Sequence, residues 1–323
     1  MSVVFRTFLA ALITSVATAQ AVAQSYPAKA VHIVVPFPPV GAADLLSRAL
    51  GKQLGETWNQ AVVVDNRPGA GGNIGAEAVA KSAPDGYTLL MAAATTHAVS
   101  MSLYSKLGYD LEKDLVPVTL VANVPHILVA NPSLPGKTLG EAIAFLKSQG
   151  GKVNFASQGN GTLSHLEFEL MKSMAGFSAI HVPYKGSAPA LTDLLAGNVV
   201  LLFDSIPSSL PHVRAGKLKG IAVAASRRSP VLPDLPTLSE AGLTGFAADN
   251  WFGIMAPAGT PAAIVAKLNS DITRALDSAE VKEIVARQGG ELMASTPQQM
   301  AAQIRSDREK WGKVVRESGA KIE

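Results

Sequence analysis

The chain has 323 residues, of which 48% are hydrophobic and 16% charged, so it can form one large core or two medium ones and is not disordered. Its formal net charge is +3 and only 6% of its residues are aromatic, which argues against a nucleic-acid-binding surface. It contains no cysteine, which excludes disulfides, thiolate metal sites and a cysteine nucleophile.

The first predicted element is a signal peptide over residues 1–23. Arg6 supplies a positive start, residues 8–17 are an apolar stretch, and Ala21–Ala23 form a small-x-small cleavage site. A second candidate cleavage site is Ala17–Ala19. The apolar stretch is too short for a membrane anchor, and no later segment is long enough to span a bilayer. We therefore expect a periplasmic mature protein that begins near Gln24 and is soluble after cleavage.

From residue 31 the chain repeats a short apolar run, a loop rich in glycine and proline, and an amphipathic helix. VHIVVPF at 31–37 precedes a helix with Leu46, Leu50 and Leu54 on one face. Further strands are expected at 61–66 and 87–94, with a helix between them that ends at Ala80. Strands that alternate with helices predict an α/β fold with a mainly parallel sheet.

The pattern restarts at residue 126 and predicts a second α/β lobe. Strands are expected at 126–132, 152–157, 179–184, 199–204 and 221–226. Thr138 and Glu141 form a capping-box pair at the start of one helix. In a later helix, Ser187 can cap the start and Gly197 can end it.

The last part of the chain begins with a proline-rich stretch. Residues 227–246 are a candidate linker region. The stretch WFGIMAPAGTP at 251–261 is then expected to be a strand followed by the start of a helix at Thr260 and Pro261. The final helix places Met300, Ile304 and Trp311 on one face, and its other residues carry charges of alternating sign, which indicates a surface helix docked on the protein.

ASQGNGTLSHLEFEL at 156–170 is the stretch that most resembles a catalytic or cofactor loop. A dinucleotide site needs a third glycine where the chain has Ser164, and a P-loop needs Gly-Lys-Ser/Thr, whereas Gly161 precedes Thr162. No Gly-x-Ser-x-Gly elbow occurs, and adjacent Ser164 and His165 point about 100° apart on a helix. The histidines also lack zinc-site spacing. We therefore predict no catalytic residue, no cofactor and no metal.

The same stretch has the features of an anion-binding loop. Ser164 and Glu167 fit a Ser-x-x-Glu capping box. Gly159 and Gly161 allow the backbone to turn, so that several N–H groups and the positive helix end face one point, where carboxylates and phosphates bind. Thr162 and Ser164 would add hydroxyl donors. The loop therefore predicts binding of an anion.

A set of motifs, in a fixed order from Tyr26 to the C-terminal WGKVVRESGA, carries a family resemblance. They are YPAKAVHIVVPFPP, DNRPGAGGNIGAE, APDGYTLL, LVPVTLVANVPHILVANPS, SQGNGTLSH, HVPYKGSAPALTDLLAG, SRRSPVLPDLPTLSEAGL and WFGIMAPAGTP. The chain resembles the Bug-type (TctC-like) solute receptors, the extracytoplasmic subunits of tripartite tricarboxylate transporters. The resemblance implies a type II-like periplasmic binding protein with a ligand cleft between two lobes. Lobe 1 would comprise residues 26–124 and 247–323, and lobe 2 residues 125–246, with the linker region near 227–246.

The resemblance also places the ligand-binding residues. In lobe 1 they are Phe37, Pro39, Val40, Gly41, Ala42, Asp44, Thr95 and His97. In lobe 2 they are Ser157, Gly159, Asn160, Gly161, Thr162, Ser164, His165, Lys185, Gly186 and Asp204. Three of them have structural alternatives, because Asp44 can cap its helix, His97 can be a buried packing residue and Lys185 can be a solvated loop charge.

Two positions depart from the family pattern. The family usually has glycine where this chain has Val40, and often asparagine where it has Ser205. Val40 adds a branched apolar group at the expected cleft wall and removes a permissive backbone position. Our hypothesis is that Val40 favours a ligand with an apolar body over the usual di- and tricarboxylates.

The function predicted from these patterns is capture of a small carboxylate-bearing organic acid for a membrane permease, without catalysis. The receptor is expected to be a monomer that closes over its ligand by a hinge motion and does not bind nucleic acid. One alternative is a receptor that informs a sensor kinase, which would need the same closed state. A less favoured alternative is an exported hydrolase or lyase that uses His165 or His97 with Asp204.

Overall fold

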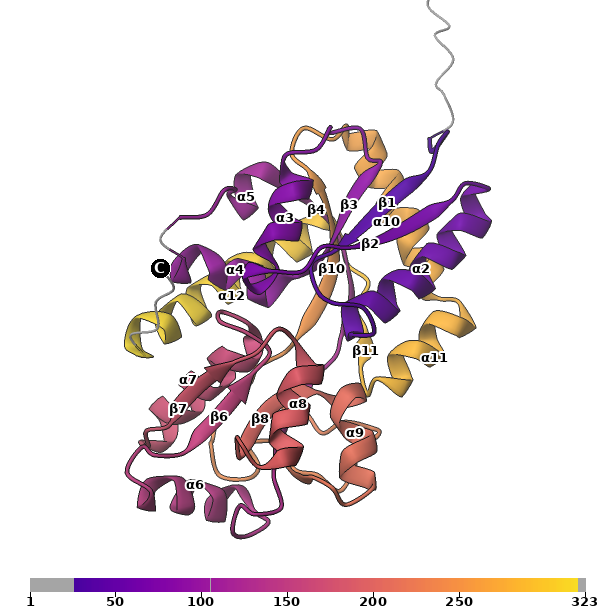
Figure 1. Ribbon diagram of the computed structural model, residues 1–323. Helices are drawn as coiled ribbons and strands as arrows, with labels where there is room; N and C mark the ends of the chain where they lie inside the picture. The colour runs from indigo at the N-terminus through magenta and orange to yellow at the C-terminus, as the bar shows by residue number, and fades with distance from the viewer. Residues whose placement is uncertain (1–25, 105, 319–323) are drawn as a thin grey trace, which may run out of the picture.

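The computed structural model describes residues 26–104 and 106–318, without the side chains of residues 94–96, 98 and 318. The predicted signal peptide lies outside the described residues. Figure 1 shows two α/β lobes, one above the other, each with its own sheet. Among the described residues, no helix is both long and apolar enough to cross a membrane.

The upper lobe, lobe 1, is built from both ends of the described chain. Its sheet has the order β11-β4-β10-β3-β1-β2. Its N-terminal elements are β1 (Val31–Val35), α2 (Ala42–Trp58), β2 (Val62–Asn66), the 3-10 turn η1 (Ala70–Gly72), α3 (Asn73–Ala80), β3 (Thr88–Ala93), α4 (Ala94–Leu103), α5 (Leu111–Asp114) and β4 (Leu115–Asn123). Its C-terminal elements are β10 (Trp251–Pro257), α10 (Ala262–Leu276), α11 (Ala279–Arg287), β11 (Glu291–Leu292) and α12 (Pro297–Ser318).

The lower lobe, lobe 2, is continuous in sequence. Its sheet has the order β7-β6-β8-β5-β9. The elements are β5 (His126–Ala130), α6 (Leu139–Ser148), β6 (Asn154–Ser157), α7 (Leu163–Ala175), β7 (Ile180–Pro183), α8 (Ser187–Ala196), β8 (Leu201–Ser205), α9 (Ile206–Arg214) and β9 (Lys219–Ala224). The strands therefore occur near all five expected positions.

The sheets are mixed, whereas the sequence pattern predicted mainly parallel sheets. Parallel pairing joins β1 to β2 and β3 in lobe 1, and β6 to β7 and β8 in lobe 2. Strand β10 is antiparallel to β3 and β4, and β5 is antiparallel to β8 and β9. Strands β4, β5, β9 and β10 flank the two crossings between lobes. The chain passes from β4 to β5 without a helix. The strand–helix–strand connection that makes neighbouring strands parallel is therefore missing at this point.

The predicted helix faces pack into the cores. Leu46, Leu50 and Leu54 of α2 are all buried in the lobe 1 core. Helix α12 spans both lobes, because Ile304 packs in a lobe 1 cluster while Trp311 packs against the lobe 2 core. It contacts both α4 and α7. The C-terminal helix is thus a docked helix, as predicted, and it connects the two lobes.

The predicted caps at Thr138 and Gly197 are confirmed, and the one at Ser187 is wrong. Thr138 and Glu141 form both hydrogen bonds of a capping box at α6. Gly197 ends α8 in the left-handed region, at φ 83°. The residue that caps the start of α8 is Gly186, and the hydroxyl of Ser187 instead donates to Asp204 Oδ1 at 2.6 Å.

The two segments that cross between the lobes are bonded to each other. Val124 N donates to Asn250 O at 2.8 Å, and Asn250 Nδ2 lies 3.2 Å from His126 Nε2. His126 Nδ1 lies 2.7 Å from Glu167 Oε2, and both side chains are buried. Although burial opposes it, the charge of Glu167 raises the pKa of His126. Residues 225–250 contain no helix or strand, and Phe246 from this segment packs on the lobe 2 core.

Candidate functional site

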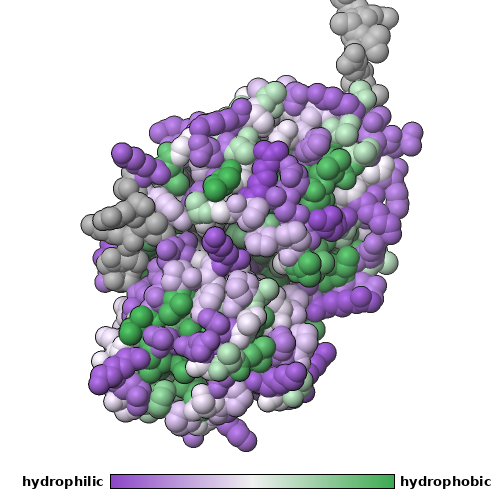
Figure 2. All heavy atoms as spheres, in the orientation of Figure 1, coloured by the Kyte–Doolittle hydropathy of each residue, from purple (hydrophilic) through white to green (hydrophobic). Residues whose placement is uncertain are grey.

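The carboxyl ends of the parallel strands in the two lobes face each other. Strands β1, β2 and β3 in lobe 1, and β6, β7 and β8 in lobe 2, each lead into a helix at this edge. Tyr104 OH donates to Asn160 O across the gap at 3.4 Å, and a Cβ at Gly186 would lie 3.5 Å from Pro38 Cγ. Figure 2 shows a hollow on the surface where the lobes meet. Ligands of open α/β sheets bind at such strand ends.

The helices that begin at this edge share an unusual feature. Among the described residues, no side chain caps the first N–H groups of α2, α3, α4, α7, α8 or α9. Side chains do cap α5, α6 and α11, which begin elsewhere, although α10 also begins without one. Uncapped N–H groups and the positive ends of helix dipoles are therefore concentrated between the lobes.

In lobe 1, the loop between β1 and α2 is held by Asp44. This buried carboxylate accepts from Val40 N at 3.0 Å, from Arg48 at 2.9 and 3.0 Å, and from Asn66 Nδ2 at 3.0 Å. Burial alone would raise its pKa, but the Arg48 hydrogen bond and the other donors lower it. The helix cap is Gly41. Asp44 therefore fixes the loop from inside and is occupied by protein donors.

Val40 is the most exposed large hydrophobic residue of the described chain, at 76%, and lies at the tip of this loop. Its φ is 72°, a left-handed conformation that disfavours branched side chains. Phe37 and Pro38 of the same loop are partly buried, whereas Pro39 is exposed. The loop thus presents an apolar, strained tip beside the uncapped start of α2, where Ala42 is buried.

Replacing Val40 with glycine should stabilise the protein by about 1 kcal/mol, since glycine adopts positive φ without steric cost. Urea unfolding of the two proteins measures this difference. Val40→Ala keeps a Cβ and should gain much less. Equal gains from glycine and alanine would mean that the left-handed backbone is not the source of the strain.

Two other predicted lobe 1 residues come from α4. His97 is fully buried, and its Nε2 lies 3.3 Å from Gly72 O. Burial lowers its pKa to about 4, so it is a neutral packing residue behind the loop before α3. Thr95 begins the same helix, but its side chain lies outside the described residues.

In lobe 2, the glycine loop after β6 uses most of its own donors. Gly159 N donates to Ser157 Oγ at 3.1 Å, and Gly161 N donates to His165 Nδ1 at 3.3 Å. The hydroxyl of Thr162 donates to Gly159 O at 2.8 Å, and that of Ser164 donates to Phe203 O at 2.5 Å. The prediction that Thr162 and Ser164 supply free hydroxyl donors is therefore wrong for this conformation.

The predicted capping box at Ser164 is also wrong. The cap residue of α7 is Thr162, at which the chain is extended, so Ser164 is the second residue of the helix. Glu167 does not reach back to the helix start, because it pairs with His126 near the crossing segments. Both side chains that fit the local motif have found distant partners instead.

Several donors around the loop remain available. Asn160 is exposed, and within the described chain no acceptor is shown for the N–H groups of Leu163 and Ser164. Lys185 is exposed between β7 and α8, and it makes no hydrogen bond or ion pair with any described residue. Gly186, which follows it, donates to Gln158 O at 3.0 Å. A lysine ammonium and the uncapped starts of α7 and α8 therefore lie beside this loop on the lobe 2 side.

Asp204 connects the loops of lobe 2 through hydrogen bonds, and it is not a free carboxylate that faces the space between the lobes. Its Oδ1 accepts from Gln158 Nε2 at 2.7 Å and from the Ser187 hydroxyl at 2.6 Å, and its Oδ2 accepts from the Ser209 hydroxyl at 2.7 Å. Asp204 is fully buried. Gln158 and Ser187 thus join the three loops of lobe 2, although sequence reasoning did not select them as site residues.

His165 lies below the glycine loop in a stack with His181. The ring centroids are 3.9 Å apart and the planes differ by 6°. Burial lowers the pKa of His165 to about 4, and burial together with His165 lowers that of His181 to about 3. Neither of the histidines proposed for a hydrolase is bonded to Asp204, because His165 bonds Gly161 and His97 bonds Gly72.

These lowered pKa values predict loss of stability in acid. In the unfolded chain a histidine binds its proton near pH 6.5, whereas folded His165 does so near pH 4 and folded His181 near pH 3. The unfolded state therefore takes up more protons, and the free energy of unfolding should fall as the pH drops from 6.5 to 4, by up to roughly 3 kcal/mol per residue.

Urea unfolding between pH 7 and pH 4 measures this slope. His165→Asn should make it shallower, although His97 and His181 still contribute, and the matched change at an exposed histidine, His32→Asn, should not. His126 acts in the opposite direction, because its raised pKa adds stability that is lost as the pH rises. A slope that His165→Asn leaves unchanged would contradict the assignment.

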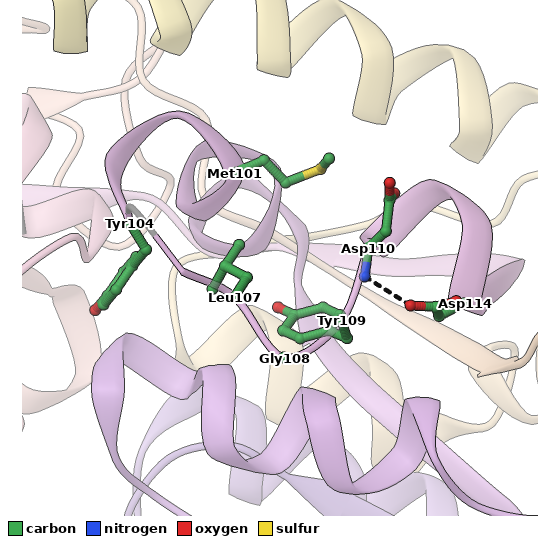
Figure 3. A pocket seen from close by; sticks show the side chains of 7 residues that line it. All are labelled: Met101, Tyr104, Leu107, Gly108, Tyr109, Asp110 and Asp114. Atoms are coloured by element: carbon green, nitrogen blue, oxygen red, sulfur yellow. Dashed lines mark hydrogen bonds between the residues drawn. The ribbon is translucent and has the colours of Figure 1, made fainter.

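A second pocket lies on lobe 1 beside α4 and α5. It has a volume of about 480 Å³ and is lined by Met101, Tyr104, Leu107, Gly108, Tyr109, Asp110 and Asp114 (Figure 3). Asp110 N donates to Asp114 Oδ2 at 2.7 Å. Its ionisable lining is acidic, so it is unsuited to an anion.

Comparisons with known proteins match most of the chain. A family model described as "Tripartite tricarboxylate transporter family receptor" matches residues 46–320. Protein BugT of Bordetella pertussis is 43% identical over 301 residues, which are 93% of this chain and 92% of that protein. An R. palustris protein solved with adipate has a TM-score of 0.86 at 37% identity, covering 91% of this chain and 98% of that one. MatC from Rhodopseudomonas palustris, solved with bound malate, has a TM-score of 0.84 at 36% identity, covering 90% and 100%.

Proposed function

We propose that the chain holds a small carboxylate-bearing organic acid between its lobes. It belongs to the receptor family of the tripartite tricarboxylate transporters, and it is a solute receptor and not an enzyme. The observation that carries the proposal is the concentration of uncapped helix starts at the facing strand ends, with Lys185 beside them. This arrangement offers N–H donors and positive charge to a carboxylate. The adipate and malate in two similar structures have the same chemistry.

The proposed contacts to the ligand come from the hydrogen-bond donors that have no partner within the described protein. On lobe 2, one carboxylate accepts from the first N–H groups of α7 and α8, from Asn160 and from Lys185. On lobe 1, the start of α2 at Ala42 and the apolar tip at Val40 contact the rest of the ligand. Charge-assisted hydrogen bonds from such preformed groups give both affinity and orientation. Asp44 and Asp204 act by fixing the loops.

The structural division of the receptor supports a hinge motion. We propose that residues 26–124 with 247–323 move against residues 125–246, and that the crossing segments at Val124 and Asn250 bend. Closure brings the Tyr104 hydroxyl to Asn160 O, the contact present in this conformation. A permease can recognise the closed receptor because closure changes the surface that spans both lobes. We propose that the receptor is a periplasmic monomer that is exported by its signal peptide.

Val40 sets the expected ligand preference. Its isopropyl group is exposed at the tip of the loop, where the family resemblance leads us to expect glycine, so we expect an acid with an apolar body to bind more tightly than citrate. Calorimetric titration with adipate, malate, citrate and a branched or aromatic acid measures this order. Much tighter binding of citrate than of the apolar acids would overturn the Val40 hypothesis but not the receptor function.

Native mass spectrometry of the purified protein tests the function itself. The expected result is one retained small acid per chain, which adipate or malate displaces. Failure of every carboxylate to bind, or sustained formation of product from one of them, would contradict the proposal. A receptor that informs a sensor kinase would show the same binding, so transport of the retained acid by cells with and without a tripartite permease separates the two roles.

A further inference from the structure

The glycine loop of lobe 2 rests on a column of stacked rings. His165 stacks on His181 at 3.9 Å, His181 on Phe155 at 4.9 Å, and Phe155 on Phe168 at 4.0 Å, all within 19° of parallel. Both phenylalanines are fully buried in the lobe 2 core. The two imidazoles are thus the end of a rigid column that begins in the core and reaches the loop.

Each imidazole is bonded to a different part of the loop. His165 Nδ1 accepts from Gly161 N at 3.3 Å. His181 Nε2 lies 2.6 Å from Ser157 Oγ, which in turn accepts from Gly159 N and donates to Gly159 O, both at 3.1 Å. If His181 Nε2–H is the donor, every one of these contacts is satisfied at once, because a hydroxyl oxygen has two acceptor sites and one proton.

We propose that His165 and His181 are positioning residues, which set the backbone of residues 159–161 so that Asn160 and the start of α7 meet the ligand. This inference rests on the proposed function and assigns a role to two residues that the ligand does not touch. The histidines act through specific ring nitrogens, one as an acceptor and one as a donor, and not only as aromatic filling. Gly159 and Gly161 have φ values of 141° and 74°, which glycine adopts without steric cost, so their backbone has wide conformational freedom and the hydrogen bonds select its path.

The same geometry requires a neutral His165. A proton on its Nδ1 would point at the Gly161 N–H, so that two donors would face each other. The ionisable groups near the pair are Glu169, at 3.7 Å from His165 Nε2, and Lys172, which bonds Glu169 at 2.9 Å. Lys172 opposes a charge on either ring, whereas Glu169 is ion-paired with Lys172.

Pairs of amide variants test which ring nitrogen matters. An asparagine oxygen can take the place of Nδ1, and a glutamine amide group that of Nε2. The proposal therefore expects His165→Asn to keep the Gly161 bond and His165→Gln to lose it. At position 181 the order reverses, because His181→Gln keeps the Ser157 bond and His181→Asn loses it. All four variants remove the stacking of His165 on His181. The two variants at each position therefore lose the same stacking contact and differ in which ring nitrogen the amide replaces.

Two readouts are measured on the full-length mature protein. The first needs no ligand: hydrogen exchange of the Gly159 and Gly161 amides should quicken roughly tenfold or more in His165→Gln and His181→Asn, relative to their partner variants. The second is the dissociation constant for adipate, which should rise roughly tenfold in the same two variants. Equal exchange rates within each pair would overturn the proposal. If the amides respond as expected while the wild-type protein binds no carboxylate, the proposed function fails and the positioning role stands.

Discussion

The oxidised double variant Gly71→Cys/Asn160→Cys is expected to release adipate roughly 100-fold more slowly than the same protein after reduction. A Cβ at Gly71 would lie 3.1 Å from Asn160 O, so the two positions meet across the lobes. The chain has no cysteine of its own, so the new pair can only bond with each other within a molecule. Gly71 has a φ of 64°, where a cysteine costs about 1 kcal/mol.

Stopped-flow release of adipate before and after reduction measures this effect. A ligand that lies between the lobes cannot leave while they are tied together, whereas one bound in the pocket beside α5 can. The two single variants serve as controls and should release adipate at the same rate with and without reductant. Unchanged release from a variant whose disulfide is confirmed by mass would show that lobe opening is not required.

Replacing Lys185 with methionine is the second change with a large expected effect. Binding of adipate should weaken about 10- to 100-fold, because a charge-assisted hydrogen bond contributes roughly 1.5–3 kcal/mol. The fold should not change, since Lys185 is exposed and has no partner among the described residues. Isothermal titration at low and high salt measures both the affinity and its salt dependence, which should decrease together in the variant.

Lys152→Met is the matched control for this change. Lys152 is also exposed and belongs to the same lobe, but it lies at the far end, just before β6 begins. Its loss removes the same charge and should leave affinity within about twofold. Lys185→Arg should retain most of the binding. If the two methionine variants weakened binding equally, Lys185 would contribute only to the overall field of the protein.

Much of the fold could be predicted because its signals are local. The spacing of Leu46, Leu50 and Leu54 and the capping box of Thr138 and Glu141 need only neighbouring residues, and both occur in the structure. Strand β4 was not among the predicted strands, and it contains Pro117, a residue that is rare inside strands. The antiparallel course of the crossing strands also has no local signal, because it depends on how the chain passes between lobes.

The interior of the site could not be predicted for the same reason. Ser164 and Glu167 fit a helix cap, yet their partners are Phe203 and His126, about 40 residues away in each case. Gln158 and Asp204 are 46 positions apart and meet only because β6 and β8 pair. Local motifs identify where such loops lie, but long-range hydrogen bonds decide which of their donors stay free.

A crystal structure of the protein with adipate would show directly whether the ligand lies between the lobes. We expect a carboxylate between the lobes that accepts from the first N–H groups of α7 and α8 and from Lys185, with the ligand's apolar chain beside Val40. A ligand in the pocket beside α5, or one whose carboxylates contact only lobe 1, would contradict it.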